Sequence, residues 1–171
     1  MDQTVVPKRR VPATFNSPLE TGIRAVAVLA ASYPRPFDLQ RLVAFDHLLV
    51  HTGDIGGPAS LHPPVPLRSA ELLVRRPLIE RALLLMMTRD LVNRGVWVGS
   101  LGIAYIAGEN AAPFLAAIQS DYVKALQERA RWLVHNFGAM ADGEFRALVR
   151  RFFDQWVEEF QNAERSLGVE V

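Results

Sequence analysis

The chain has 171 residues, enough for one domain with a real hydrophobic core, and its 19 basic and 18 acidic side chains leave a formal net charge of +1. This balance disfavours a dedicated nucleic-acid-binding protein, because neutralising phosphates usually requires a clear basic excess. The sequence contains no cysteine, which excludes disulfides, thiolate zinc sites and cysteine nucleophiles.

The first seventeen residues contain two prolines and no hydrophobic periodicity, so residues 1–17 are predicted to form an extended N-terminal arm. A helix is predicted to follow, with Ser17 as its N-cap and Pro18 in its first position. It is expected to end before Tyr33, because prolines follow there. Asp38 is predicted to cap a second helix, in which apolar residues recur at helical spacing.

The connection over residues 51–66 holds three glycines and four prolines, so no helix or central strand is expected to pass through it. Connections of this length without regular structure are uncommon in compact domains and are more often functional than accidental. Beyond it, Ser69 is predicted to cap a short helix through Arg75. Pro77 is then expected to restart or kink the helix, which continues to about Val92.

A β-hairpin is predicted after this helix. Gly95 has the character of a residue that ends a helix, and the β-prone segments Val96–Val98 and Ile103–Ile106 flank residues 99–102, whose composition suits a turn. Helix, helix, helix and hairpin in this order predict a winged helix-turn-helix. Such domains either bind nucleic acid or serve as adaptors between proteins.

Two further helices are predicted at the C-terminal end. One runs from Asn110 to Phe137 and the other from Asp142 to about Leu167, each with an apolar stripe. The predicted fold class is therefore α+β and mainly helical. It consists of a winged-helix domain over residues 18–108 and a C-terminal two-helix extension over residues 109–171.

Several residues suggest chemistry, but each lacks the partners that the chemistry needs. His47 and His51 are four residues apart on one helix, yet a zinc site needs a third ligand. The glycine-rich segment around Asp54 has neither the preceding strand nor the lysine of a phosphate-binding loop. Ser60 and His62 are close in sequence, but no strained turn surrounds the serine. We therefore predict no catalytic residue, no cofactor and no metal, and the alternative of a small hydrolase is disfavoured.

The helix predicted from Pro77 occupies the recognition position of a helix-turn-helix. A helix that reads base edges presents polar side chains, whereas residues 82–87 are apolar almost all round. Such a helix is buried on most faces, by the core or by another protein. A winged-helix DNA-binding transcription regulator therefore stays open only as an alternative function.

The segment LVHTGDIGGPASLHPPVPLRSAELLVRR resembles the middle component of bacterial ABC-three-component systems, and more narrowly that of Lamassu-type anti-phage systems. Later pieces fit the same family: Arg94-Gly95, Gly102-Ile103-Ala104-Tyr105, Ala112-Pro113-Phe114 and Arg129-Ala130-Arg131-Trp132. The resemblance covers about Leu19 to Phe137. It implies a non-catalytic accessory subunit, encoded beside an SMC-like ABC ATPase and an effector that is often a nuclease. The subunit is expected to bridge these two partners and to help hold the effector inactive.

The apolar fraction of 50% exceeds what a small core easily hides, which favours a stable partner interface. Candidate interface residues lie where the resemblance is sharpest and are of types usually exposed: Asp54, His62, Arg68, Glu71, Arg75 and Arg76. Contact with DNA is expected mainly through the complex, with Lys8, Arg9 and Arg10 as candidates for contacts to the DNA backbone. No signal peptide or membrane-spanning segment is visible, so the protein is expected in the cytoplasm, away from membranes.

Overall fold

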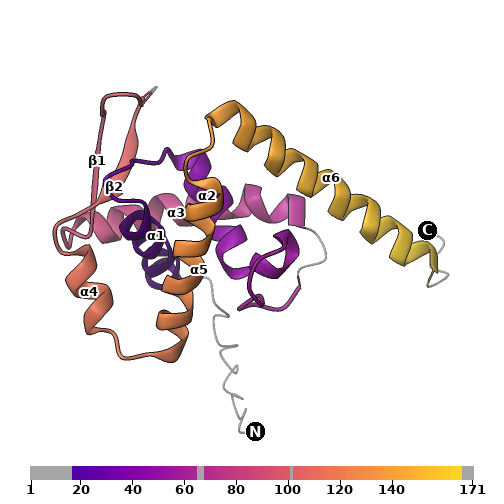
Figure 1. Cartoon of the computed structure of the whole chain (residues 1–171), viewed down its shortest axis with the longest axis horizontal. Helices are drawn as coiled ribbons and strands as arrows, with labels where there is room; N and C mark the ends of the chain where they lie inside the picture. The colour runs from indigo at the N-terminus through magenta and orange to yellow at the C-terminus, as the bar shows by residue number, and fades with distance from the viewer. Residues whose placement is uncertain (1–16, 65–67, 101, 167–171) are drawn as a thin grey trace, which may run out of the picture.

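The computed structural model describes residues 17–64, 68–100 and 102–166 (Figure 1). The elements in these residues are, in chain order, α1 (Pro18–Ser32), α2 (Leu39–Val50), the 3-10 helix η1 (Thr52–Ile55), α3 (Arg68–Met87), β1 (Val92–Gly95), β2 (Ala104–Ala107), α4 (Ala111–Ala117), α5 (Asp121–Phe137) and α6 (Asp142–Ser166). A mainly helical α+β class is therefore confirmed. The sheet in the described part has two antiparallel strands.

The starts of the first two helices are confirmed in their predicted form. The Ser17 hydroxyl accepts a hydrogen bond from the Glu20 amide at 3.2 Å, while the Ser17 amide donates to the Glu20 carboxylate at 3.5 Å. This reciprocal capping box satisfies two amides at the start of α1. At α2, the Asp38 carboxylate accepts from the Arg41 amide at 2.7 Å. Both signals lie within three residues in sequence, which is why sequence alone could find them.

Helix α3 differs from its prediction. It runs unbroken from Arg68 to Met87, with Pro77 inside it, so of the predicted restart or kink at Pro77 the restart is wrong. The predicted end near Val92 is also wrong, and Ser69 lies inside the helix and does not cap it. The chain leaves the helix through Asp90, whose φ of 57° is left-handed. Aspartate adopts this conformation more readily than most residues with a Cβ, and it ends the helix without a glycine.

The hairpin exists, but its first strand lies four residues earlier than predicted. β1 pairs with β2 so that Val92 faces Ala107 and Gly95 faces Ala104. Most of the predicted strand over 96–98 instead belongs to a turn, in which the Ser100 amide donates to the Trp97 carbonyl at 3.0 Å. Gly99 takes a φ of +89° in this turn, a value that suits glycine.

The long helix predicted from Asn110 to Phe137 is two helices. Ile118 has an extended backbone, with ψ 107°, after α4, and Ser120 then caps α5 by accepting from the Val123 amide at 3.4 Å. The apolar spacing continues across the break, so periodicity alone predicted one helix. The serine cap is the local signal that the prediction overlooked.

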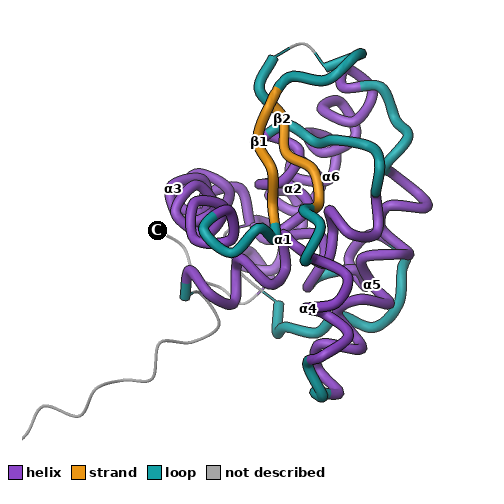
Figure 2. Tube along the Cα trace, turned by 90° about the vertical axis from the view of Figure 1, so that its left-hand side faces the viewer, coloured by secondary structure: helices purple, strands orange, loops and turns teal. Residues whose placement is uncertain are grey.

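The core gathers around α1 and α2. The largest apolar side chains that are 0% exposed come from α1, α2 and α5: Leu29, Phe45, Leu49, Leu126 and Leu133. Helix α1 packs against both α3 and α5 (Figures 1 and 2). The loop end of the hairpin points away from α3, and the C-terminal part of α6 runs outward from the rest of the molecule. Among the described residues, no helix is both long and apolar enough to cross a membrane.

Candidate functional site

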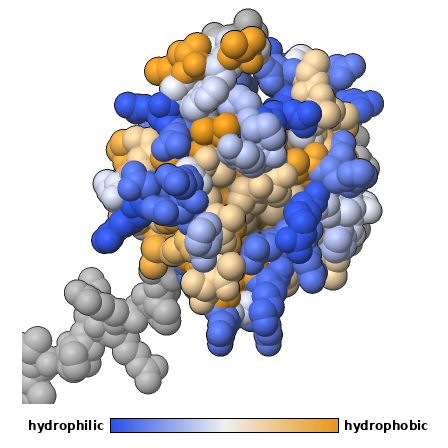
Figure 3. Space-filling model, turned by 60° about the vertical axis from the view of Figure 1, so that its left-hand side comes forward, coloured by the Kyte–Doolittle hydropathy of each residue, from blue (hydrophilic) through white to orange (hydrophobic). Residues whose placement is uncertain are grey.

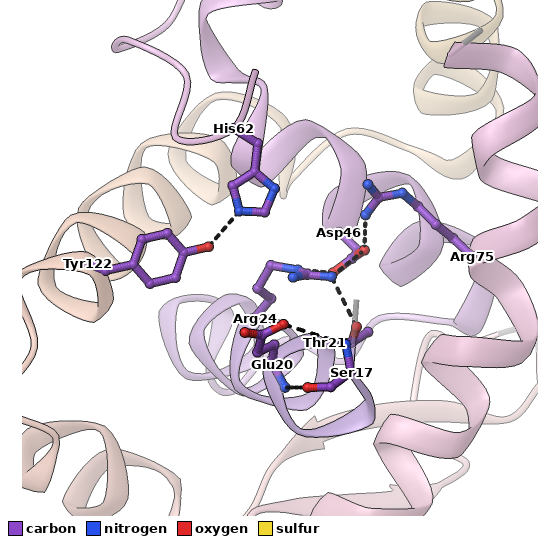
Figure 4. Close-up of polar contacts among 8 residues, drawn as sticks. All are labelled: Ser17, Glu20, Thr21, Arg24, Asp46, His62, Arg75 and Tyr122. Carbon is purple, nitrogen blue, oxygen red and sulfur yellow. Dashed lines mark hydrogen bonds and ion pairs between the residues drawn. The ribbon is translucent and has the colours of Figure 1, made fainter. Parts of the chain in front are cut away.

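A cluster of three charged side chains lies inside the molecule where α1, α2 and α3 meet (Figure 4). Asp46 on α2 accepts hydrogen bonds from Arg24 on α1, at 2.6 Å from Nε and 3.2 Å from Nη2. It also accepts from Nη1 of Arg75 on α3. The three side chains are between 2% and 7% exposed. One carboxylate therefore joins three helices.

The electrostatics of the cluster favour the charged form of Arg24. Burial by itself acts to lower the pKa of Arg24, but the Asp46 carboxylate outweighs it, so the pKa is raised. Arg24 Nη2 also donates to the Thr21 hydroxyl at 3.0 Å. Bidentate arginine–carboxylate pairs fix the orientation of both side chains. We conclude that the cluster sets how the first three helices are placed.

Arg75 is a correction to the sequence analysis, which placed it among residues of exposed type. Its relative exposure is 6%. A helical arginine in a charged segment is usually solvated, but here Asp46, 29 residues away in sequence, offers it a buried partner. The next residue, Arg76, is exposed and lies 3.6 Å from Glu80 on the same helix.

A row of rings leads from the core towards the surface beside this cluster. His47 and His51 have ring centroids 4.5 Å apart, and His51 and His62 are 6.2 Å apart. His62 Nε2 lies 2.8 Å from the Tyr122 hydroxyl. Burial, then the nearby cations Arg24 and Arg75, lower the pKa of His62. His62 is therefore neutral at pH 7.

Burial has the opposite effect on Tyr122, whose pKa it raises. The His62–Tyr122 contact is therefore one between two neutral groups at neutral pH, a hydrogen bond rather than an ion pair. Across the described residues, no group of three or more histidine and acidic side chains is arranged to hold a metal ion. These packed rings lie between the core and the loop that follows α2.

The loop over residues 51–64 is attached to one face of α5. The Arg129 guanidinium donates to the Ala59 carbonyl, at 3.2 Å from Nε and 3.0 Å from Nη2. Gly57 lies under the Trp132 ring so closely that a Cβ there would be 2.5 Å from Cη2. With the His62–Tyr122 contact, three side chains of α5 at positions 122, 129 and 132 hold the loop.

The loop is also bonded to itself. The Thr52 hydroxyl donates to the Pro58 carbonyl at 2.8 Å, and the Gly53 amide donates to the Ser60 hydroxyl at 3.1 Å. Gly56 has a φ of +78°, a left-handed conformation that favours glycine. The expectation that no helix passes through is wrong for the single 3-10 turn η1. A 3-10 turn needs few residues and avoids the prolines that follow it.

Among the described residues, six of the exposed large apolar side chains lie on two elements, the hairpin and α3, and define two surfaces. The hairpin surface consists of Val96, Val98 and Ile103, which are 70%, 106% and 62% exposed. The α3 surface consists of Val74, Leu84 and Leu85, which are 74%, 53% and 37% exposed. Figure 3 shows hydrophobic side chains at the top of the molecule, where the hairpin loop lies, above a more hydrophilic region.

The remaining predicted site residues are dispersed. Asp54 is partly buried in η1, and His62 is partly buried against α5. The side chains of Arg68 and Glu71 lie outside the described residues. So do the predicted DNA-backbone contacts Lys8, Arg9 and Arg10. In the structure, His62 thus lies within electrostatic reach of the charged cluster, which includes Arg75, whereas Arg76 is exposed.

Four residues of the site were not found by sequence reasoning: Arg24, Tyr122, Arg129 and Trp132. The last three share a helix face, since positions seven and ten residues after Tyr122 point the same way. Sequence reasoning used Arg129 and Trp132 only as pieces of the family resemblance, and Tyr122 only as part of an apolar stripe. Arg24 is the one charged residue in a run of apolar ones in α1, a signal that was available, although its partner 22 residues later was not evident.

Comparison with models of known protein families identifies the family of this chain. A model of the family described as ABC-three component (ABC-3C) system Middle Component 2 matches residues 14–159. The chain belongs to this family. The match spans every described element from α1 to most of α6, including the charged cluster and the loop on α5. Searches of curated proteins and of solved structures found no match.

By its description, an ABC-3C Middle Component 2 is one component of a multi-subunit system, so the chain has partner components. This confirms the broader of the two resemblances seen in the sequence. An accessory role in a defence system follows from the family. The loop over 51–64, where that resemblance was sharpest, is the part that α5 holds in a fixed shape.

Proposed function

We propose that this Middle Component 2 is a non-catalytic accessory subunit that bridges an SMC-like ABC ATPase and an effector nuclease, as in Lamassu-type anti-phage systems. In this proposal it helps to hold the effector inactive until the ATPase engages foreign DNA. Family membership supports the accessory role. The described residues that resemble catalytic pairs are used in packing: the Ser60 hydroxyl closes its own loop, and His62 contacts Tyr122.

The observation that carries the proposal is the presence of two separate apolar surfaces. A bridging subunit needs one contact surface for each partner, and protein interfaces are built around buried aliphatic and aromatic anchors. The hairpin surface and the α3 surface meet this need at different places on the molecule (Figure 2). The loop over 51–64 and the exposed Arg76 provide further polar contacts to a partner, away from these two surfaces.

The α3 surface does not support the alternative function, that of a winged-helix transcription regulator. A helix that reads DNA needs polar side chains at its centre, whereas α3 exposes Val74, Leu84 and Leu85. If the three helices and the hairpin form a winged helix, we propose that it acts as a protein adaptor. DNA then meets the complex chiefly through the ATPase.

The test is co-purification. The affinity-tagged chain is co-expressed with the other components of its own system, and the stoichiometry of the recovered complex is measured by native mass spectrometry. We expect both an ATPase and an effector in the complex. A variant in which Val96, Val98 and Ile103 are all serine is expected to keep its fold and lose one partner.

The matched control is a variant with serine at exposed positions elsewhere, Ala112 and Ala116 on α4, which carries polar substitutions outside both apolar surfaces. It is expected to retain both partners. Failure of the unmodified chain to recover any component would contradict the proposed function. Full recovery of both partners by the hairpin variant would contradict the assignment of the hairpin surface alone.

A further inference from the structure

A groove lies between α2, α3 and α6, separate from the loop and from the two apolar surfaces. Its volume is about 350 Å³, within the range of roughly 300–1,000 Å³ that is typical of ligand sites. Its apolar lining comes from all three helices: Val43 and Ala44 from α2, Leu72 from α3, and Phe145 and Val149 from α6. Leu72 and Val149 are half-buried, so an occupant would remove further apolar surface from water.

Arginines surround this apolar floor. Arg76 from α3 and Arg146 and Arg150 from α6 line the groove, and all three are exposed. The pair between Arg76 and Glu80 spans 3.6 Å with both side chains about half exposed, so water screens it and the arginine stays available. The side of the groove formed by α3 and α6 is therefore cationic.

The acidic residues of the lining are already engaged by the fold. Asp38 caps α2 through the Arg41 amide. Asp142 lies 3.0 Å from Arg41 Nη2, and Arg41 also donates to the carbonyls of Gly138 and Met140 while its guanidinium lies over the Phe145 ring. Among the described residues of the lining, these contacts account for Arg41 and for the carboxylates of Asp38 and Asp142, so Arg76, Arg146 and Arg150 set the charge that an occupant meets there.

We propose that this groove binds an acidic amphipathic segment of a partner component, with apolar anchors on the floor and carboxylates on Arg76, Arg146 and Arg150. Arginine suits this role, because its planar guanidinium pairs with a carboxylate through two hydrogen bonds. The inference rests on the proposed function, since it names the chemistry by which one component of the complex is held.

Charge and shape select this occupant over others. A nucleic-acid backbone would bring phosphates without apolar anchors for Leu72 and Val149, and it would approach the carboxylates of Asp38 and Asp142. The chain's own residues 1–16 carry three basic side chains and one acidic one, so the arginines would repel them. An acidic segment with aliphatic side chains complements both the floor and the rim.

The direct test is photo-crosslinking in the assembled complex. A benzoylphenylalanine is introduced at Gln40, which is exposed and lines the groove, and in a matched protein at Gln119, which is exposed and outside it. Crosslinked peptides are identified by mass spectrometry. We expect position 40 to capture a segment of a partner component rich in aspartate or glutamate with apolar residues at helical spacing, and position 119 not to capture it.

Charge-reversal variants provide the second test. The double variant Arg76→Glu, Arg150→Glu is expected to weaken partner binding by about tenfold or more, because like charges then face the carboxylates. The conservative variant Arg76→Lys, Arg150→Lys is expected to keep most of the affinity. The control Lys124→Glu, Arg131→Glu makes the same change in net charge at exposed positions of α5 and is expected to bind as the unmodified chain does.

The outcomes separate the two proposals. If the complex assembles but position 40 captures DNA, a second copy of this chain, a basic segment or nothing, the groove proposal is wrong and the accessory role stands. Equal binding by the charge-reversal and control variants overturns it in the same way. If no component co-purifies with the chain, the proposed function fails and the groove proposal fails with it.

Discussion

Replacing Asp46 with asparagine is expected to lower the free energy of unfolding by about 3–5 kcal/mol, the usual cost of removing one partner from a buried ion pair. Asp46 is 3% exposed and accepts hydrogen bonds from Arg24 at 2.6 Å and 3.2 Å and from Arg75. Asparagine keeps the shape of the side chain but removes the charge. Two buried guanidiniums then have no anion between them, and α1, α2 and α3 lose their common contact.

Urea unfolding followed by circular dichroism measures this loss, and a fall in melting temperature of roughly 6–20 °C is expected for a chain of this size. The control is Asp121→Asn. That aspartate is fully exposed and lies 3.9 Å from Lys124, so no measurable change is expected. A loss of less than about 1 kcal/mol for Asp46→Asn would refute the reasoning, since it is no more than an ordinary hydrogen bond contributes.

Three further predictions concern the loop on α5. Gly57→Ala is expected to cost about 1–3 kcal/mol and to shift Trp132 fluorescence, because its Cβ would overlap the ring. Gly143→Ala, whose Cβ meets open space in α6, is expected to leave the fluorescence unchanged and not to lower stability. The pKa of His62 is lowered in the folded chain, so as pH falls the unfolded chain binds a proton at this histidine first. The free energy of unfolding is therefore expected to fall as pH drops below about 6.5, and to fall less steeply in His62→Gln. A parallel pH profile in His62→Gln would contradict this. Arg129→Met is expected to speed hydrogen exchange in the loop amides, and unchanged exchange would show that its two bonds to the loop do not hold it.

Sequence reasoning succeeded where the deciding contact is local. Ser17 and Asp38 cap helices through amides three residues away, so their sequence neighbours were enough to place α1 and α2. The α+β class followed from adding such local signals in chain order.

Sequence reasoning failed where contacts between residues far apart in the sequence determine the local structure. β-propensity favoured residues 96–98 as a strand, but the hairpin register is set by Val92 entering the core at 1% exposure and by Tyr105, which exchanges two backbone hydrogen bonds with Phe37. Pro77 was expected to interrupt a helix that packing against α1 and α2 maintains. Local sequence carries neither of these contacts.

The candidate site shows the same limit. The interface residues were chosen for charge and for family likeness, and that choice could not separate Arg75, which pairs with Asp46 inside the molecule, from its neighbour Arg76, which is exposed. An alanine at Arg75 would therefore report on stability rather than on partner binding. The groove could not be predicted at all, because its floor comes from helices that meet only in the folded chain.

The measurement that tests the central claim most directly is reconstitution by omission. The SMC-like ATPase and the effector of the system are purified and mixed with and without this chain, and the mass of the assembly is measured by native mass spectrometry. A bridging subunit predicts one complex that holds all three proteins and its loss when this chain is left out. Co-assembly of the ATPase and effector to the same extent without this chain would contradict the account.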